Sequence, residues 1–227
     1  MTRHIKAVVF DMDGLLLDTE RLSRQAWLAG GRDLGVELPL TALTSIIGRR
    51  RPEVEAEFRA AMGESFAVDA LYERHAAHYH ALLAATPAHE LRKPGLDALL
   101  HFLDVHAIPR AIATSTLAAG AAHKLALAEL APRFPIVVTG EQVARSKPAP
   151  DIFLEAARRL QVNPADCVAF EDSDLGLDAA LAAGMLAIAV PDLKPLPSTM
   201  MSRVAATLGA LDEAMDWLAP RLVRPTT

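Results

Sequence analysis

The sequence of 227 residues has a single cysteine, Cys167, and only 5% aromatic residues. One cysteine excludes an internal disulfide. Because Cys167 lies in the apolar run Cys167–Phe170, we expect a small buried side chain rather than a reactive thiol. The scarcity of aromatics, in a chain that is 52% hydrophobic, predicts a core built mainly of Ala, Leu, Val and Ile. A hydrophobic fraction this high excludes a disordered chain.

An excess of positive charge and long apolar runs are also missing. The net charge of −5 argues against a surface that binds nucleic acid. Every apolar stretch is far shorter than the roughly 20 residues that a membrane helix needs. The first apolar run begins at Ala7, which leaves no room for a signal peptide. We therefore expect a soluble, cytoplasmic protein without nucleic-acid or membrane partners, as a monomer or a weak homodimer.

Short apolar runs recur along the chain with helical patterns between them. Five of these runs predict buried strands, at Ala7–Phe10, Ala111–Ala113, Ile136–Val138, Cys167–Phe170 and Leu186–Val190. Alternation of strand and helix predicts an α/β fold, with a Rossmann-like parallel sheet covered by helices on both faces. Right-handed crossovers then place the carboxyl ends of all strands along one edge, where ligands of such sheets bind.

One long segment interrupts this alternation. From about Arg21 to His89 the apolar spacing is helical and no strand is evident. Breaker residues around Pro87 and Pro94 mark its end. The sequence therefore predicts a Rossmann-like core of residues 1–17 and 90–227, interrupted by a small all-helical cap domain of residues 18–89. Near the other end of the chain, the apolar spacing over 208–218 predicts a final amphipathic helix.

Two carboxylates and a glycine directly follow the first predicted strand. Asp11, Asp13 and Gly14 are poor choices for packing a core, but they suit phosphoryl transfer. Asp11 is placed to attack phosphorus and form an aspartyl-phosphate, Asp13 to act as general acid and base, and Gly14 to let the backbone approach the phosphate. The charge of Asp11 would repel a phosphate, so cations must offset it, and Mg²⁺ held by carboxylates is the first choice.

The ends of the other predicted strands supply complementary groups. Thr114 and Ser115 follow the second strand, where hydroxyl and backbone N–H groups can hold phosphate oxygens. Lys147 follows the third strand and offers a point charge for a phosphate. Glu171 and Asp172 close the fourth strand and supply further carboxylates for a metal. Taken singly, each has an ordinary explanation, since a lone lysine is usually solvated and an acidic pair is common in turns.

These motifs resemble those of the haloacid dehalogenase superfamily, in particular the branch with a helical cap after the first motif that includes β-phosphoglucomutase and many sugar-phosphate phosphatases. Asp11 and Asp13 match the first motif and Thr114 the second, while Lys147 matches the third, and Glu171 with Asp172 the fourth. The resemblance implies Mg²⁺ dependence, a phosphoenzyme, and a metal site of Asp11, Asp13, Glu171 and Asp172. In that site Asp13 contributes its backbone carbonyl.

Two departures from the mutases of this branch favour a phosphatase. Mutases carry a histidine on the first cap helix where this sequence has Ser23, and a cap lysine where His75 falls. We therefore expect a Mg²⁺-dependent phosphatase that hydrolyses a small phosphorylated metabolite, such as a sugar phosphate. A phosphomutase and a non-catalytic binding protein on the same fold are the alternatives.

Three features of the predicted cap have competing interpretations. The basic run of three arginines at 49–51 lies in a loop that faces the active site in relatives, so Arg51 first, and Arg49 after it, are expected to contact an anionic substrate unless the loop is simply solvated. Asp18 and Thr19 are expected to cap the first cap helix. Histidines at 75, 78 and 80 share helix faces but have no further ligand nearby, which favours packed or solvated histidines over a zinc site.

Overall fold

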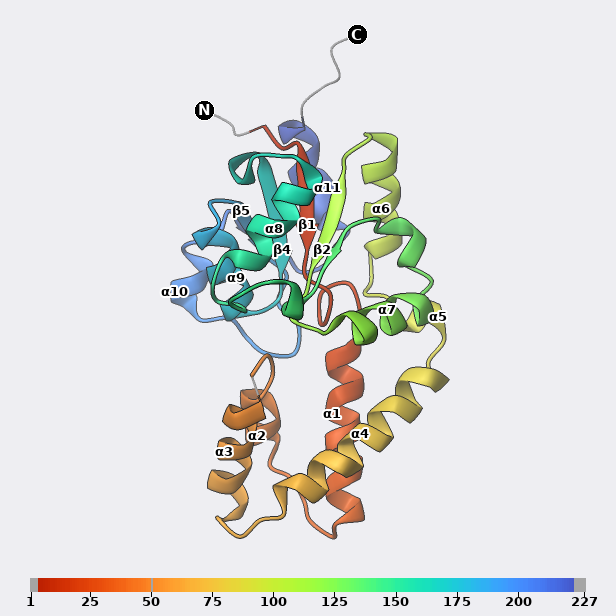
Figure 1. Ribbon diagram of the computed structural model, residues 1–227, viewed down its shortest axis with the longest axis vertical. Coiled ribbons are helices and arrows are strands. Elements are labelled where there is room, and N and C mark those ends of the chain that lie inside the picture. The colour runs from red at the N-terminus through yellow and green to blue at the C-terminus, as the bar shows by residue number, and fades with distance from the viewer. Residues whose placement is uncertain (1–3, 50, 223–227) are drawn as a thin grey trace.

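The computed structural model describes residues 4–49 and 51–222, and in them a six-stranded sheet forms the centre of the molecule (Figure 1). All neighbouring strands are parallel, in the order β3-β2-β1-β4-β5-β6. The strands are β1 (Ala7–Phe10), β2 (Arg110–Ala113), β3 (Val137–Val138), β4 (Cys167–Glu171), β5 (Leu186–Ala189) and β6 (Ala206–Thr207). The five predicted strands are confirmed to within a residue at each end. The two-residue β6 was not predicted, since it lacks an apolar run.

The strand order reverses between β1 and β4, which pair side by side with Phe10 opposite Phe170. From β1 the sheet grows outwards through β2 and β3, and the chain then returns to the other side of β1 to start β4. Ligands of open parallel sheets bind beyond the carboxyl ends of the strands at such a reversal. Asp11 follows β1 and Glu171 ends β4, so both carboxylates lie at this point.

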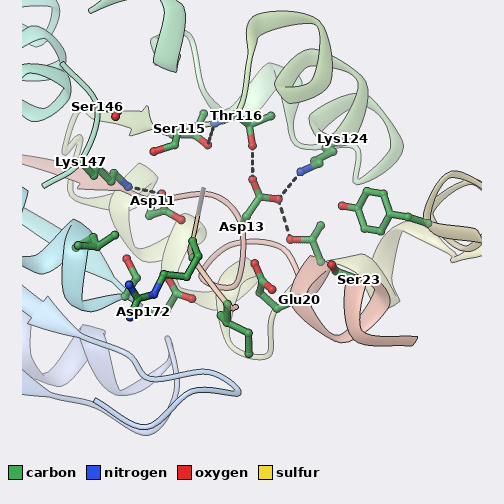
Figure 2. A pocket seen from close by; sticks show the side chains of 18 of the residues that line it. Asp11, Asp13, Glu20, Ser23, Ser115, Thr116, Lys124, Ser146, Lys147 and Asp172 are labelled. Carbon is green, nitrogen blue, oxygen red and sulfur yellow. Dashed lines mark hydrogen bonds and ion pairs between the residues drawn. The ribbon is translucent and has the colours of Figure 1, made fainter. Parts of the chain in front are cut away.

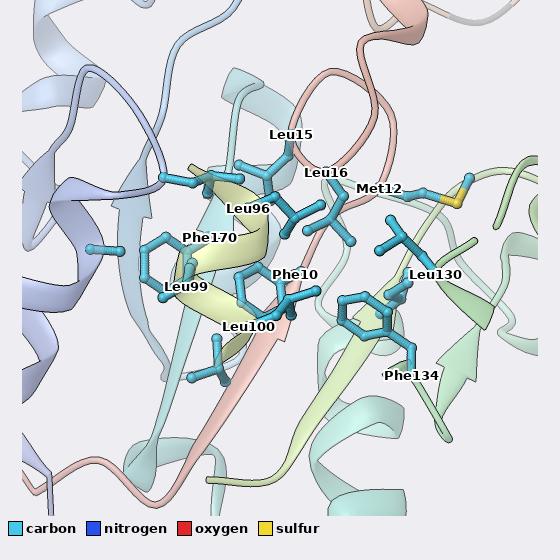
Figure 3. Close-up of a cluster of buried hydrophobic side chains, with 14 of the residues drawn as sticks. Phe10, Met12, Leu15, Leu16, Leu96, Leu99, Leu100, Leu130, Phe134 and Phe170 are labelled. Atoms are coloured by element: carbon cyan, nitrogen blue, oxygen red, sulfur yellow. The ribbon is translucent and has the colours of Figure 1, made fainter. Parts of the chain in front are cut away.

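Alternate residues of β1 face two separate apolar clusters, one on each side of the sheet. Val8 and Phe10 belong to the cluster on one face, and Ala7 and Val9 to that on the other, as the two-residue period of a strand requires. In the first cluster Phe10 stacks on Phe170 with ring centres 5.4 Å apart (Figure 3). Burial on both faces explains why this strand is uniformly apolar.

Helices before and after the later strands cover the sheet. They are α6 (Leu96–Val105), α7 (Ala118–Leu127), α8 (Asp151–Leu160), α9 (Asp174–Ala182), α10 (Ser198–Met201) and α11 (Glu213–Leu218). The final predicted helix is shorter than expected, because α11 begins only at Glu213. Leu208 instead continues β6 by donating its N–H to the carbonyl of Ala189. Both Leu208 and Leu211 are buried in the same apolar cluster as Phe10. Cys167 is fully buried, and burial raises its pKa to about 12, which confirms its packing role.

Between β1 and α6 the described chain forms helices and no named strand, as predicted. It forms α1 (Thr19–Asp33), α2 (Leu40–Ser45), α3 (Arg51–Met62), α4 (Val68–Ala85) and α5 (Ala88–Leu91). The first four lie beyond the carboxyl edge of the sheet (Figure 1) and share a small apolar cluster of their own. In it Trp27 packs against Phe58, with ring centres 5.1 Å apart. We keep residues 18–89 as the proposed extent of the cap.

The two chain segments that connect the sheet with these helices run side by side. Leu17 and Arg92 form an antiparallel bridge, and the N–H of Asp18 donates to the carbonyl of Leu91 at 2.8 Å. Lys93 adds an ion pair to Asp192, 2.7 Å away in the loop after β5. These paired connecting segments therefore fix the position of the helical segment relative to the sheet. In residues 4–49 and 51–222, none of the helices combines the length and apolarity needed to cross a bilayer.

Candidate active site

A cavity of about 560 Å³ opens between the carboxyl edge of the sheet and the cap (Figure 2). Its walls contain most of the residues that the sequence indicated. The sheet contributes Asp11, Asp13, Thr114, Ser115, Lys147 and Asp172, and the cap contributes Glu20, Ser23, Arg49, His75 and Tyr79. The carboxyl ends of separate strands thus bring together groups that lie more than 150 residues apart in the chain.

Lys147 forms the cationic centre of the sheet side. Its Nζ donates to Asp11 Oδ1 and to Glu171 Oε1, each at 2.5 Å, and its side chain is only 8% exposed. Burial by itself would lower the pKa of Lys147, but the two carboxylates outweigh this effect and raise it above its usual value. The ammonium group therefore remains charged beside the predicted nucleophile.

Three carboxylates converge next to this lysine. Ligand atoms of Asp11, Glu171 and Asp172 all lie within 4.8 Å of one another, and all three residues are buried. Burial, followed by the charge of Glu171, raises the pKa of Asp172. Burial is also the main cause that raises the pKa of Asp11 to about 7. A buried cluster with more negative than positive charge, made only of oxygen ligands, fits a hard divalent cation such as Mg²⁺.

Asp13 points away from this cluster and is held by three donors. Its Oδ1 accepts from Lys124 Nζ at 2.6 Å and from Thr19 Oγ1 at 2.8 Å, and its Oδ2 accepts from Thr116 Oγ1 at 2.6 Å (Figure 2). Burial alone would raise the pKa of Asp13, but Lys124 and the hydrogen bonds outweigh it and lower the pKa. The role of the Asp13 backbone carbonyl as a metal ligand stays a prediction.

The contact of Thr19 with Asp13 corrects one expectation. Asp18 precedes the first residue of α1, yet no side-chain hydrogen bond caps this helix end. Asp18 instead pairs with Arg21 at 2.5 Å. The prediction that Asp18 and Thr19 cap the helix was therefore wrong, because both side chains have stronger partners: a cation for Asp18 and the Asp13 carboxylate for Thr19.

The expected approach of the Gly14 backbone to phosphate stays a prediction, and the structure shows a second reason for glycine at this position. Its φ is +83°, in the left-handed region that favours glycine. A Cβ built on it would lie 2.2 Å from Asp172 Oδ2, so the missing side chain makes room for this carboxylate. Thr114 is buried, and its hydroxyl accepts from the backbone N–H of Thr116 at 3.1 Å. It lines the cavity together with Ser115, as predicted.

The two described arginines of the basic loop separate. Arg49 lines this cavity and also an adjoining cavity of about 320 Å³ within the cap, whereas Arg51 lines the second cavity and not the first. Arg51 donates to Glu55 at 2.7 Å and to Asp69 at 2.6 Å. The structure therefore places Arg49, rather than Arg51, beside the predicted catalytic groups. The middle arginine, Arg50, lies outside the described residues.

Ser23 and His75, the two positions at which we expect a difference from mutases, meet on the cap wall. The Ser23 hydroxyl lies 3.1 Å from His75 Nε2, and the His75 ring stacks on Trp27 at 3.7 Å between centres. Burial lowers the pKa of His75 to about 4, so the ring is neutral at pH 7. Among the described residues, His75 belongs to no group suited to hold a metal.

Lys124 and Glu20 are cavity residues that the sequence reasoning missed. Lys124 lies on α7, the helix after β2, and its contact with Asp13 depends on how that helix faces the sheet. Glu20 directly follows the Asp18-Thr19 pair, and that position was its only sequence signal. Its carboxyl group lies near that of Asp13 (Figure 2), and burial raises its pKa to about 7.

Comparison with known proteins identifies the family. The model of the haloacid dehalogenase-like hydrolases matches residues 5–184. The chain belongs to this family. It is 37% identical over 196 residues to a probable pseudouridine-5′-phosphatase of Drosophila melanogaster, covering 84% of this chain and 83% of that one. It is 34% identical over 197 residues to the fructose-1-phosphate phosphatase YqaB of Escherichia coli, covering 84% and 98%.

Other relatives of this haloacid dehalogenase-like hydrolase include a mutase. The chain is 31% identical over 198 residues to the β-phosphoglucomutase of Bacillus subtilis, covering 85% and 86%. Among solved structures, a family member from Deinococcus radiodurans with bound phosphate and sodium superposes with a TM-score of 0.82 at 27% identity, covering 97% and 98%. The predicted family, fold class and hydrolase class are confirmed.

We expect Mg²⁺ to stabilise the folded protein by binding the Asp11–Glu171–Asp172 cluster. A ligand that binds only the folded state stabilises it by about 2.7 kcal/mol at one hundred times its Kd, which corresponds to roughly 5–10 °C in Tm for a chain of this size. Thermal unfolding in EDTA and in excess Mg²⁺ measures the shift. Asp172→Asn should lose most of it, and Asp174→Asn, on the neighbouring helix, should keep it. An equal shift in both variants would contradict the assignment.

Proposed function

We propose that this chain is a Mg²⁺-dependent phosphatase that hydrolyses a small phosphorylated metabolite, such as a sugar phosphate, through an aspartyl-phosphate. The observation that carries the proposal is the separation of two aspartates within one cavity. Asp11 is bound by Lys147 beside the carboxylate cluster, whereas Asp13 is held by Lys124 and two hydroxyls. A nucleophile and an acid–base group need such different surroundings.

In the first step Asp11 attacks phosphorus. Lys147 binds Oδ1 of Asp11, so we assign the attack to Oδ2. The bond between phosphorus and the alcohol oxygen breaks. Asp13, whose lowered pKa means that it must first take up a proton, gives that proton to the alcohol oxygen. Thr114, Ser115 and Lys147 hold the phosphoryl oxygens. This step leaves an aspartyl-phosphate on Asp11 and a free alcohol.

The second step reverses the role of Asp13. It takes a proton from water, which attacks phosphorus, and the bond between phosphorus and Asp11 breaks to release phosphate. Asp11, Glu171 and Asp172, with the Asp13 carbonyl, would hold Mg²⁺, which supplies positive charge to the phosphoryl group. The cap covers the cavity and keeps out bulk water.

The cap wall favours hydrolysis over a mutase reaction. A mutase must hold a sugar phosphate in two orientations, and its cap lysine contacts phosphate. His75, which is neutral at pH 7 because burial lowers its pKa to about 4, cannot supply that charge. Ser23 is hydrogen-bonded to it and has no basic nitrogen. Of the described cap residues that line the cavity, Arg49 is the cation placed to meet an anionic group.

A product assay with β-glucose 1-phosphate separates the two reactions. We expect inorganic phosphate to be released and glucose 6-phosphate to stay undetected, because the cap lacks the groups of a mutase. The same phosphate-release assay over fructose 1-phosphate, pseudouridine 5′-phosphate, phosphoglycolate and nucleotides ranks substrates by kcat/KM. Glucose 6-phosphate as the main product would establish the mutase alternative. Absence of turnover on the whole panel and on p-nitrophenyl phosphate, with Mg²⁺ present, would favour a non-catalytic binding protein.

A further inference from the structure

A chain of side-chain contacts connects the cap with Asp13. Tyr79 on α4 interacts through its hydroxyl with Lys124 on α7, and Lys124 Nζ lies 5.8 Å from the centre of the Tyr79 ring. Lys124 in turn donates to Asp13 Oδ1 at 2.6 Å. The α4 and α7 helices pack against each other, so this contact crosses the boundary between the proposed cap and core.

The acidic side chains around Asp13 explain why it needs the positive charge of Lys124. The carboxyl groups of Asp11, Glu20 and Asp172 line the same cavity, and Lys147 is already bound to Asp11 and Glu171. A buried carboxylate without a cation would be repelled by its neighbours and would turn toward water. The Lys124 side chain is only 14% exposed, so its charge acts on Asp13 with little screening.

Lys124 also fixes the direction in which the Asp13 carboxyl group faces. Lys124 and Thr19 share Oδ1, and Thr116 holds Oδ2, so the group is bound on both oxygens. Thr19 begins α1 and Thr116 follows β2, and both donate through short hydroxyl-bearing side chains. Lys124 is the charged member of this set, and Tyr79 lies beside its ammonium group, with 5.8 Å between Nζ and the ring centre.

We propose that Lys124 is a positioning residue that holds Asp13 for proton transfer, and that Tyr79 makes this positioning depend on the cap. This inference rests on the proposed function, in which Asp13 protonates the leaving oxygen. Tyr79 approaches from the cap, so displacement of α4 loosens Lys124 and with it Asp13. Proton transfer is then efficient only when the cap covers the cavity.

Leaving groups of different basicity test this role. Phenyl phosphate and p-nitrophenyl phosphate have similar shapes, but only the phenolate of the first needs a proton as it departs. For Lys124→Met we expect kcat/KM to fall on the order of 10²-fold with phenyl phosphate, within the range of general acid catalysis, and less than about 5-fold with p-nitrophenyl phosphate. The value of kcat/KM depends only on the steps up to formation of the phosphoenzyme. The later role of Asp13 as a base therefore does not affect this comparison.

Tyr79→Phe tests the contribution of the cap without removing a charge. We expect kcat/KM to fall about 10-fold with phenyl phosphate and to fall less with p-nitrophenyl phosphate. Adding Tyr79→Phe to Lys124→Met should cause no further loss of kcat/KM, since both substitutions act through one contact. Lys124→Arg should recover part of the activity. Lys6→Met, which removes an exposed ion pair to Asp166, is the matched control and should change neither rate. If Lys124→Met does not fold, the pattern of Tyr79→Phe alone decides.

Two outcomes overturn the inference while leaving the proposed function intact. Equal losses on the two substrates would mean that Lys124 supports the structure or binds the phosphoryl group, and additive effects of the two substitutions would mean that Tyr79 does not act through Lys124. A wild-type protein without activity on either substrate, or with activity that Asp11→Asn retains, would overturn the proposed function and the inference together.

Discussion

Asp11→Asn is expected to abolish phosphate release and to leave the fold intact. An amide at this position keeps the size of the side chain but cannot attack phosphorus, and loss of a nucleophile lowers kcat by at least about 10⁴-fold in comparable cases. Burial is the main cause that raises the pKa of Asp11 to about 7. A carboxyl group with a raised pKa favours folding below its unfolded pKa and loses this contribution as the pH rises through 7. At pH 8, removing its charge should therefore not unfold the metal-free protein.

Phosphate release and thermal unfolding, both at pH 8, measure the two parts of this expectation. Asp151→Asn is a suitable control, because Asp151 begins α8 and pairs with Arg145 outside the cavity, and its kcat should stay within a few-fold of wild type. Appreciable turnover by Asp11→Asn would contradict the covalent mechanism. Loss of activity together with loss of the folded state would leave the nucleophile unassigned, and trapping of phosphate on the wild-type chain would then be the direct measurement.

Much of the site could be predicted because it follows from strand order. A parallel sheet brings the carboxyl ends of all strands to one edge, so residues that follow apolar runs must meet there. Asp11, Thr114, Lys147 and Asp172 are of this kind, and the structure places all four around one cavity. The sequence separations of these residues do not predict that they meet, but their positions after the strands do.

Groups on helices could not be predicted in the same way. The contact of Lys124 with Asp13 depends on the rotation of α7, which is set by packing rather than by local sequence. The positions of Arg49 and Arg51 differ by only two residues, yet Glu55 and Asp69 hold Arg51 away from the larger cavity. Acidic partners such as Glu55 and Asp69 cannot be recognised from the sequence, because acidic residues are common and Asp69 is distant in the chain. A basic loop alone therefore does not indicate which arginine faces the cavity.

Gly176→Ala is expected to destabilise the protein strongly and to impair catalysis, although alanine is the better helix former. A Cβ on Gly176 would lie between 1.7 and 2.4 Å from the three carboxylate atoms of Glu171. Glu171 is fully buried, binds Lys147, and accepts from the N–H and hydroxyl of Ser173, so it cannot move aside at low cost. Overpacking costs about 1–3 kcal/mol and separation of a buried ion pair about 3–5 kcal/mol, against a gain of about 1 kcal/mol in helix propensity.

We expect a net loss of at least about 3 kcal/mol, measured by chemical unfolding without metal, and a smaller stabilisation by Mg²⁺ than in the wild type. Gly209→Ala is the matched control, because its Cβ would approach only the flexible end of the Glu213 side chain, and its stability should change by less than about 1 kcal/mol. If Gly176→Ala were as stable as wild type and bound Mg²⁺ equally well, Glu171 would not be confined by α9. The carboxylate cluster would then be a set of adjustable side chains, and its fit to a metal would not depend on the helix that follows β4.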